Sequence, residues 1–336
     1  MNIVTSPRKR PTSSDVALLS GVSRATVSYV LNSDPRQTIS DSTRRRVLWA
    51  ADELGYVPSA AAASLRRGHS KIVILALDPL FSGHVSDQIV DSVAARLQER
   101  GYVALRHSDI DPTSIVEVAQ QVDPVGVIAL TFITRAIRER LIAVGVRRIL
   151  DVETPDGAEG PPDRPWELPI GQLQVDHLVT RGFDRIVYAL PADSTRLTIA
   201  QARLMGARIE CSNLGIEQPT VISLPLDRAS IALELQKLDR VPGRTGLCAY
   251  EDQIAIGVLG AMADLGWSAP HDLAVIGSDD LPVASLTIPA LTTVAGTVSR
   301  IGELAAEQFA ALEDGETAVF GDLDDVMFEV IQRAST

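Results

Sequence analysis

"GVSRATVSYVLN", residues 21–32, is the stretch that decides how the N-terminal part of the chain folds. Gly21 adopts a positive φ at little cost, so it can end one helix and turn the chain into the next. Ser23 is a favourable N-cap and predicts a second helix over roughly 24–32. The stretch therefore predicts the turn and the second helix of a helix-turn-helix.

The two sides of this short helix differ in composition. Val27, Val30 and Leu31 recur at three- and four-residue spacing, which predicts a buried side. The opposite side carries small polar residues and one arginine, so the helix can enter a nucleic-acid groove closely. Hydroxyls can donate to phosphates, and an arginine can reach a base edge. The candidate DNA contacts are Ser23, Arg24, Ala25, Thr26, Ser28, Tyr29 and Asn32.

A helix is predicted on either side of this stretch. Before it, Thr12 and Asp15 have the spacing of a capping-box variant. The expected buried side of that helix is formed by Val16, Ala17 and Leu19. After it, Ser40 caps an amphipathic stretch that ends at Gly55. Its expected inward residues are Val47, Leu48, Ala51 and Leu54.

Charge is distributed unevenly along the 336 residues, which are enough for two or three domains. Residues 1–70 hold ten Lys/Arg and five Asp/Glu, a balance of +5; because the whole chain has a net charge of −12, the remainder carries −17. A basic head suits a polyanionic partner, and an acidic body keeps non-specific contact with DNA low. A basic solvated face is the alternative explanation.

Several protein classes are disfavoured by the composition. No apolar run is long enough to span a membrane, and "MNIVTSPRKRPTSS" lacks the apolar stretch of a signal peptide, so a cytoplasmic protein without a membrane partner is expected. Cys211 and Cys248 lie far apart, outside any CxxC motif, and are expected to be buried thiols. Neither a phosphate-binding glycine motif nor metal-ligand spacing among the five histidines is present, so neither a cofactor nor a metal is expected.

Beyond residue 70, apolar runs of strand length alternate with helical stretches. The runs are "KIVILAL", "YVALRHS", "VGVIAL", "RRILDV", "RIVYAL", "TVISLP", "TGLCAY" and "LAVIGSD". Near-continuous apolar strands alternating with helices predict an α/β fold with parallel sheets. About nine strands are expected, too many for one comfortable unit, so two lobes are predicted.

The order of "DVALLSGVSRATVSYVLN", "TRRRVLWAADELGYVP" and "ASLRRG" resembles the DNA-binding head and hinge of the lactose-repressor (LacI/GalR) family of transcriptional regulators. The body resembles the two-lobed, periplasmic-binding-protein-like sensor of that family, on motifs such as "EDQIAIGVLGAMADLG" and "LAVIGSDD". The resemblance implies a helix-turn-helix domain over 1–57, a hinge over 58–69 and an effector-binding and dimerisation domain over 70–336. The last is expected to change lobes near 168 and near 293.

Residue roles also follow from the resemblance. Arg24 and Ala25 match the positions that choose bases, and Leu65 matches the hinge leucine that wedges into the minor groove; a core role is the alternative for Leu65. Arg203, Glu251 and Asp279 match effector-contact positions. Glu251 replaces an asparagine that is common in the family, which favours a ligand rich in hydrogen-bond donors, such as one that bears an amine.

An independent physical argument places the ligand site in the same region. Ligands of open α/β sheets bind beyond the carboxyl ends of the strands. The residues there are Asp78, Asp151, Tyr250, Glu251 and Asp279, and Phe81 and Tyr250 would add an apolar wall. Carboxylates accept from hydroxyls and an arginine donates in a fork, which suits a polyol or sugar. Purely structural roles are the alternative: a helix cap for Glu251, a turn for Asp279 and a surface position for Arg203.

The function expected from these residues is that of an effector-controlled repressor. Two chains would place their heads on a near-palindromic double-stranded operator, and a sugar-like ligand between the lobes would change operator affinity. "RAST" is not followed by a heptad-patterned tail, so a homodimer is expected. Two alternatives are a solute-binding protein, which the basic head disfavours, and a phosphoryl-transfer enzyme. The latter is disfavoured because "ALDPLF" is not followed by a phosphate-binding motif, so no enzyme activity is expected.

Overall fold

A computed structural model describes residues 11–31, 39–57, 70–77, 83–131, 133–151, 167–193, 197–241, 243–320 and 326–336. The chain divides into two compact units, residues 1–70 and 71–336. Within the described ranges, none of the helices has the length and apolar character needed to cross a membrane.

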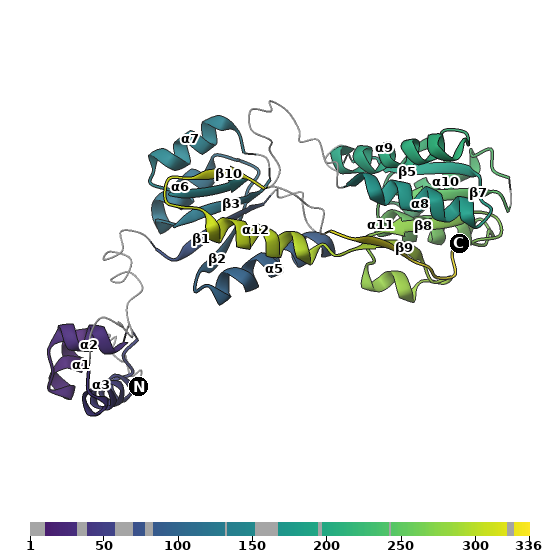
Figure 1. Ribbon diagram of the computed structural model, residues 1–336. Helices are drawn as coiled ribbons and strands as arrows, with labels where there is room; N and C mark the ends of the chain where they lie inside the picture. Colours follow the sequence, from purple (N-terminus) through teal and green to yellow (C-terminus); the bar gives the residue numbers. More distant parts are fainter. Residues whose placement is uncertain are drawn as a thin grey trace, which may run out of the picture. The chain divides into compact units, whose positions relative to one another are not determined.

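The first unit is a group of three helices, drawn in purple in Figure 1. They are α1 (Ser13–Ser20), α2 (Arg24–Leu31) and α3 (Asp41–Glu53). The predicted capping box is confirmed: the Thr12 hydroxyl accepts from the Asp15 N–H, and the Asp15 carboxylate accepts from the Thr12 N–H at 2.7 Å. Gly21 has the predicted positive φ, 67°. These local signals place α1 and α2 as a helix-turn-helix requires.

The core of the first unit is small and is built largely from valine and alanine. Its buried members are Val16, Ala17, Val27, Val30, Val47, Ala50 and Ala51. Two predictions for this core are wrong, because Leu19 is 42% exposed and Leu48 is 48% exposed. The buried side of α3 follows Val47, Ala50 and Ala51, and the next residue along a helix is turned by about 100°. Leu48 is therefore directed away from the core.

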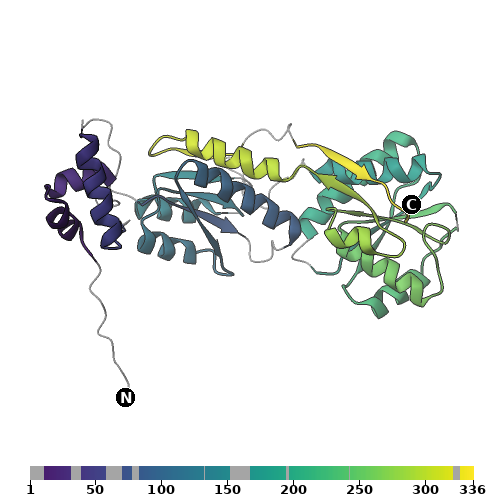
Figure 2. The ribbon, with the colours of Figure 1, turned by 90° about the horizontal axis from the view of Figure 1, so that it is seen from below.

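The second unit contains two sheets, and the first sheet has strand order β10-β4-β3-β1-β2 with all pairs parallel. Its strands are β1 (Ile72–Leu77), β2 (Val103–Ser108), β3 (Gly126–Leu130), β4 (Arg148–Asp151) and β10 (Thr317–Val319). On one face, α5 (His84–Glu99) packs beside α12 (Ser299–Ala311), as Figures 1 and 2 both show. On the other face lie α6 (Ser114–Val122) and α7 (Arg135–Ala143).

The second sheet has strand order β11-β9-β8-β7-β5-β6, in which only β11 and β9 pair antiparallel among the described pairs. Its strands are β5 (Arg185–Pro191), β6 (Thr220–Leu224), β7 (Thr245–Ala249), β8 (Ala274–Ser278), β9 (Thr292–Gly296) and β11 (Phe328–Ile331). The associated helices are α8 (Leu168–Thr180), α9 (Leu197–Leu214), α10 (Arg228–Gln236), α11 (Asp252–Asp264) and the 3-10 helix η3 (Pro282–Leu286).

Helices α8 and α9 pack against each other with almost no space between their backbones. A Cβ atom at Gly171 of α8 would lie 1.9 Å from the Arg203 carbonyl oxygen, and one at Gly206 of α9 would lie 2.0 Å from the Leu168 carbonyl oxygen. Contacts this short need glycine at both positions. The close packing fixes where α9 presents Arg203.

The predicted α/β fold with mostly parallel sheets is confirmed, and each of the eight strand-length runs forms a strand. Strands β9, β10 and β11 were not predicted as strands. The short β10 and the half-exposed β11 lack the continuous apolar run that identifies the others. Consecutive described elements change sheets at three places: from β4 to α8, from β9 to α12 and from β10 to β11. The last of these was missed.

Candidate functional site

The start of α2 is exposed. Ser23, Arg24 and Ala25 are exposed, and the Ser23 side-chain oxygen accepts from the Thr26 N–H at 3.1 Å. Val27, on the opposite side, is fully buried. The surface of α2 thus presents one guanidinium among small side chains.

The remaining predicted DNA contacts fall into two groups. Thr26, Ser28 and Tyr29 are half-buried on α2. Asn32 and Leu65, and the whole hinge over 58–69, lie outside the described residues. Phe81 and Asp78, predicted near the ligand, also lie outside them.

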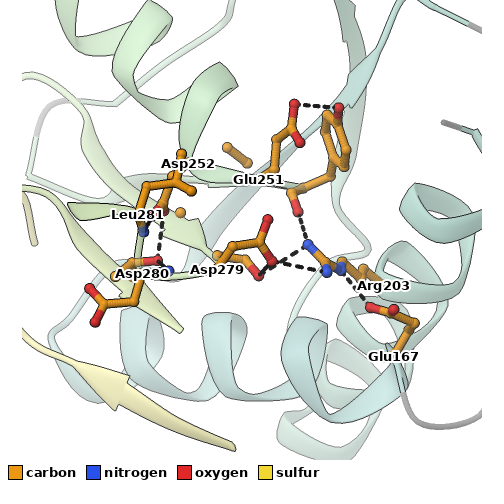
Figure 3. Close-up of polar contacts among 12 residues, drawn as sticks. Glu167, Arg203, Glu251, Asp252, Asp279, Asp280 and Leu281 are labelled. Carbon is orange, nitrogen blue, oxygen red and sulfur yellow. Dashed lines mark hydrogen bonds and ion pairs between the residues drawn. The ribbon is translucent and has the colours of Figure 1, made fainter. Parts of the chain in front are cut away.

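Arg203 is the centre of a polar cluster at the carboxyl ends of β7 and β8 (Figure 3). Its side chain is buried, and each of its three nitrogens has a partner. Nε donates to Glu167 Oε2 at 2.7 Å, and Nη1 donates to Ser278 Oγ at 3.1 Å and to the Tyr250 carbonyl oxygen. Nη2 lies 3.1 Å from Asp279 Oδ1. The surface position weighed for Arg203 is therefore wrong, because Arg203 is 6% exposed.

Asp279 follows directly after β8 and has a φ of 100°, a region that a residue other than glycine rarely adopts. Three contacts hold it there. Its N–H donates to the Val294 carbonyl oxygen at 2.8 Å, and its Oδ1 accepts from the Ser278 hydroxyl at 3.1 Å beside Arg203. Strained residues that the surrounding structure holds in place are typical of functional sites.

Glu251 occupies the N-cap position of α11, but its side chain makes no capping hydrogen bond. Its Oε1 instead accepts from the Tyr250 hydroxyl at 2.5 Å. The residue is half-buried and lies next in sequence to a carbonyl group that binds Arg203. The geometry thus gives the carboxylate no side-chain capping role.

Asp252, which was not predicted as a site residue, is a fully buried carboxylate behind this cluster. Its oxygens accept from the Thr293 hydroxyl at 2.6 Å and from the Leu281 N–H at 2.8 Å. Burial raises the pKa of Asp252 to about 7. It ties the start of α11 to β9 and to the loop after β8.

Asp151 belongs to the first sheet, at the end of β4, and is not part of the Arg203 cluster. It is fully buried, and its Oδ2 lies 2.8 Å from Arg138 Nη2. The structure thus shows an ion pair at this predicted ligand contact.

The sequence predicted Arg203, Tyr250, Glu251 and Asp279, and the structure brings these four together. Glu167 and Ser278 complete the cluster and were missed. Glu167 follows a proline- and acid-rich stretch that carries no helical or strand period. Ser278 stands immediately before Asp279, and its position at a strand end was the available signal.

Comparison with known proteins gives matches over both units. Residues 12–59 match the model of bacterial regulatory proteins of the lacI family, and residues 175–336 match that of a periplasmic binding protein-like domain. The HTH-type transcriptional regulator GntR of Pseudomonas aeruginosa is 27% identical over 97% of this chain and 96% of its own length. The ribose operon repressor of Escherichia coli is 28% identical over 88% of this chain and 91% of its own.

Solved structures with the same fold cover nearly the whole chain. The Lac repressor dimer bound to operator and an anti-inducer matches with a TM-score of 0.75 at 23% identity, over 97% of this chain and 99% of that one. The complex of the transcriptional regulator CelR with cellobiose matches with a TM-score of 0.63 at 24% identity, over 97% and 100% of the two chains.

Proposed function

The chain belongs to the LacI family of bacterial regulatory proteins, and on this premise we propose that it is a transcriptional repressor whose operator affinity is controlled by a small polar effector. The observation that carries the proposal is the exposed start of α2, where Arg24, Ala25 and the preceding Ser23 lie on the surface above a packed core. Small side chains at this position let the helix approach base edges in a major groove.

DNA recognition in this proposal has three parts. Arg24 and Ala25 read base edges, and the hydroxyls of Ser23, Thr26, Ser28 and Tyr29, with Asn32, contact phosphates and neighbouring bases. Leu65 wedges into the minor groove at the operator centre. Two chains pair as a homodimer, so that two heads address the two halves of a near-palindromic site.

Effector sensing is assigned to the cluster around Arg203. Glu251 follows β7, and Asp279 follows the neighbouring parallel strand β8. Open α/β sheets bind ligands beyond these carboxyl ends of their strands. The proposed site lies between the two lobes and includes Tyr250, together with Phe81 and with Asp151 at the end of β4. Ligand binding then changes operator affinity through the coupling of the two sites.

A test on the intact protein separates this proposal from its rivals. We expect a labelled near-palindromic DNA to shift on a native gel, and the shift to weaken as salt is added. In a thermal-shift assay with a panel of sugars, at least one sugar should raise the melting temperature of the protein. The same sugar should change the amount of DNA that the protein shifts on the gel. If sugars raise the melting temperature but the protein binds no DNA, a solute-binding protein is favoured. If the protein binds DNA but no ligand changes that binding, the proposal that it senses an effector is contradicted.

A further inference from the structure

The second sheet is split between β7 and β8 at its carboxyl edge. The pairing of these two strands ends at Cys248 and Ile276. Beyond this pair, β7 continues beside β5 up to Ala249, and β8 continues beside β9 up to Ser278. Strand pairing therefore does not join the two strand ends that lead into the Arg203 cluster.

Gln174 of α8 bridges this split. Its Nε2 donates to the Ala249 carbonyl oxygen at 2.8 Å and to the Gly277 carbonyl oxygen at 2.9 Å. Ala249 and Gly277 directly follow the last paired residue of each strand. Because one nitrogen binds both oxygens, the two carbonyl oxygens lie within about 6 Å of each other. Gln174 is fully buried, so water does not compete for these bonds.

Arg203 of α9 makes the next bridge, one residue further along both strands. Its Nη1 donates to the Tyr250 carbonyl oxygen and to the Ser278 hydroxyl. One nitrogen can bind both groups only where the two strand ends are held close together. A Cβ atom at Gly171, three residues before Gln174, would lie 1.9 Å from the Arg203 carbonyl oxygen. The close contact of α8 and α9 thus fixes the two bridging residues relative to each other.

The oxygen of the same amide has no hydrogen-bond partner. Among the described residues, Gln174 Oε1 is a buried side-chain atom that nothing pairs with. An unpaired buried oxygen destabilises the folded chain, and an apolar side chain of the same length would avoid that cost. What Gln174 contributes is therefore the pair of bonds that its nitrogen donates across the split.

We infer that Gln174 is a positioning residue of the proposed effector site. By holding the ends of β7 and β8 together, it sets the separation at which Arg203 binds both of them. The geometry of the cluster that the effector contacts then depends on a residue that is itself fully buried and acts through Arg203. The inference rests on the proposed function, since that proposal assigns effector sensing to the cluster.

The first test measures sugar binding in two variants of α8. Gln174→Met keeps the length of the side chain and removes both donors. Val175→Ala is the matched control, because it removes buried volume from the next residue without touching a bond to β7 or β8. Ribose, cellobiose, glucose and galactose are titrated into the full chain by calorimetry, at a temperature where all proteins are folded. We expect the sugar that binds the natural chain to bind Gln174→Met about tenfold or more weakly and Val175→Ala equally well.

The second test needs no ligand. The Leu281 N–H donates to Asp252 Oδ2 at 2.8 Å, which links the loop after β8 to the start of α11. Separation of the strand ends should expose this N–H, whereas general destabilisation speeds exchange across the whole sheet. By hydrogen exchange and mass spectrometry, we expect peptides that contain Leu281 to exchange about tenfold or more faster in Gln174→Met, relative to peptides from β5. Val175→Ala should show no such difference.

The outcomes separate the inference from the proposed function. Equal sugar affinity of Gln174→Met and the natural chain, or equal Leu281 exchange in Gln174→Met and Val175→Ala, would overturn the inference. If Gln174→Met does not fold, Gln174→Asn replaces it, because its amide is one carbon too short to reach both carbonyl oxygens. If none of the four sugars binds the natural chain, the exchange result alone decides the inference. A chain that binds no DNA contradicts the proposed function and leaves the exchange result as it is.

Discussion

At the scale of single residues, the first position of α2 decides what the first unit can read. Arg24 is exposed there, and its neighbours on the surface are a serine and an alanine. Arg24 is the single arginine of α2, and the small side chains beside it leave its guanidinium accessible. Base-edge contacts by arginine specify sequence, whereas phosphate contacts only position a protein.

Arg24→Ala should weaken binding to the preferred operator by about 1–3 kcal/mol and relax the preference at one base pair in each half-site. Competition gel shifts with a set of single-base operator variants measure both effects. Arg135→Ala, at a surface position in the second unit, serves as the control and should change neither. An equal loss on every sequence would make Arg24 a phosphate contact.

Arg203→Ala should lower the unfolding free energy by about 3–5 kcal/mol, because it leaves Glu167 and Asp279 buried without their partner. Denaturant unfolding measures the loss. Asp264→Ala breaks an exposed pair with Arg228 and should cost less than about 1 kcal/mol. Similar small losses in both variants would mean that Arg203 does not hold the cluster together.

At the scale of elements, the spacing of α8 and α9 depends on two glycines. Gly171→Ala would place a methyl group 1.9 Å from the Arg203 carbonyl oxygen, so the two helices must separate. We expect the unfolding free energy to fall by about 2–3 kcal/mol and the effector response to weaken, because α9 carries Arg203.

Gly260→Ala is the matched control for this prediction, because Gly260 is also a helical glycine. A Cβ there would meet its nearest neighbour, Arg228 Nε, at 3.4 Å, an ordinary contact. Thermal melting should show a gain of about 0.5–1 kcal/mol, the usual benefit of alanine over glycine inside a helix. Equal behaviour of the two variants would show that the close packing of α8 and α9 is not required.

Asp252, at the start of α11, should make stability depend on pH. Its pKa is about 7 in the folded chain and about 3.9 when unfolded, so the folded state holds a proton that the unfolded state has lost between these values. Stability should therefore fall as the pH rises from about 4 to 7, by up to about 4 kcal/mol. Denaturant unfolding across this range should show the fall in the natural chain and a smaller one in Asp252→Asn.

Local chemistry explains which elements the sequence predicted. The cap and turn residues contact only their neighbours in the chain, and the structure confirms the roles predicted for Thr12, Asp15, Gly21 and Ser40. Leu48 was misplaced because hydrophobicity alone does not choose between adjacent positions at the border of a helix face. Glu167 reaches Arg203 only through the fold, since 36 residues separate them, and no local pattern encodes that ion pair.

At the scale of the whole molecule, the DNA-binding unit and the rest of the chain carry net charges of opposite sign. Residues 1–70 carry +5 and the remainder carries −17, so the first unit attracts DNA while the second repels it. We expect operator affinity to fall about 100-fold or more between 50 and 200 mM salt, because counterions are released from the phosphates. Fluorescence anisotropy across a salt series measures the slope, and a flat dependence would contradict a phosphate-binding head.

The three changes of sheet also set an order for folding on the ribosome. Phe309 of α12 is fully buried in the first sheet's core, against Gly126 of β3, and β10 pairs with β4. The nascent chain therefore cannot finish its first sheet until residues up to 319 have emerged, after β5 to β9 have been made. The core of the three helices is built from residues that precede position 57 in the sequence. The DNA-reading unit is thus available early in translation, whereas both sheets are completed only as synthesis ends.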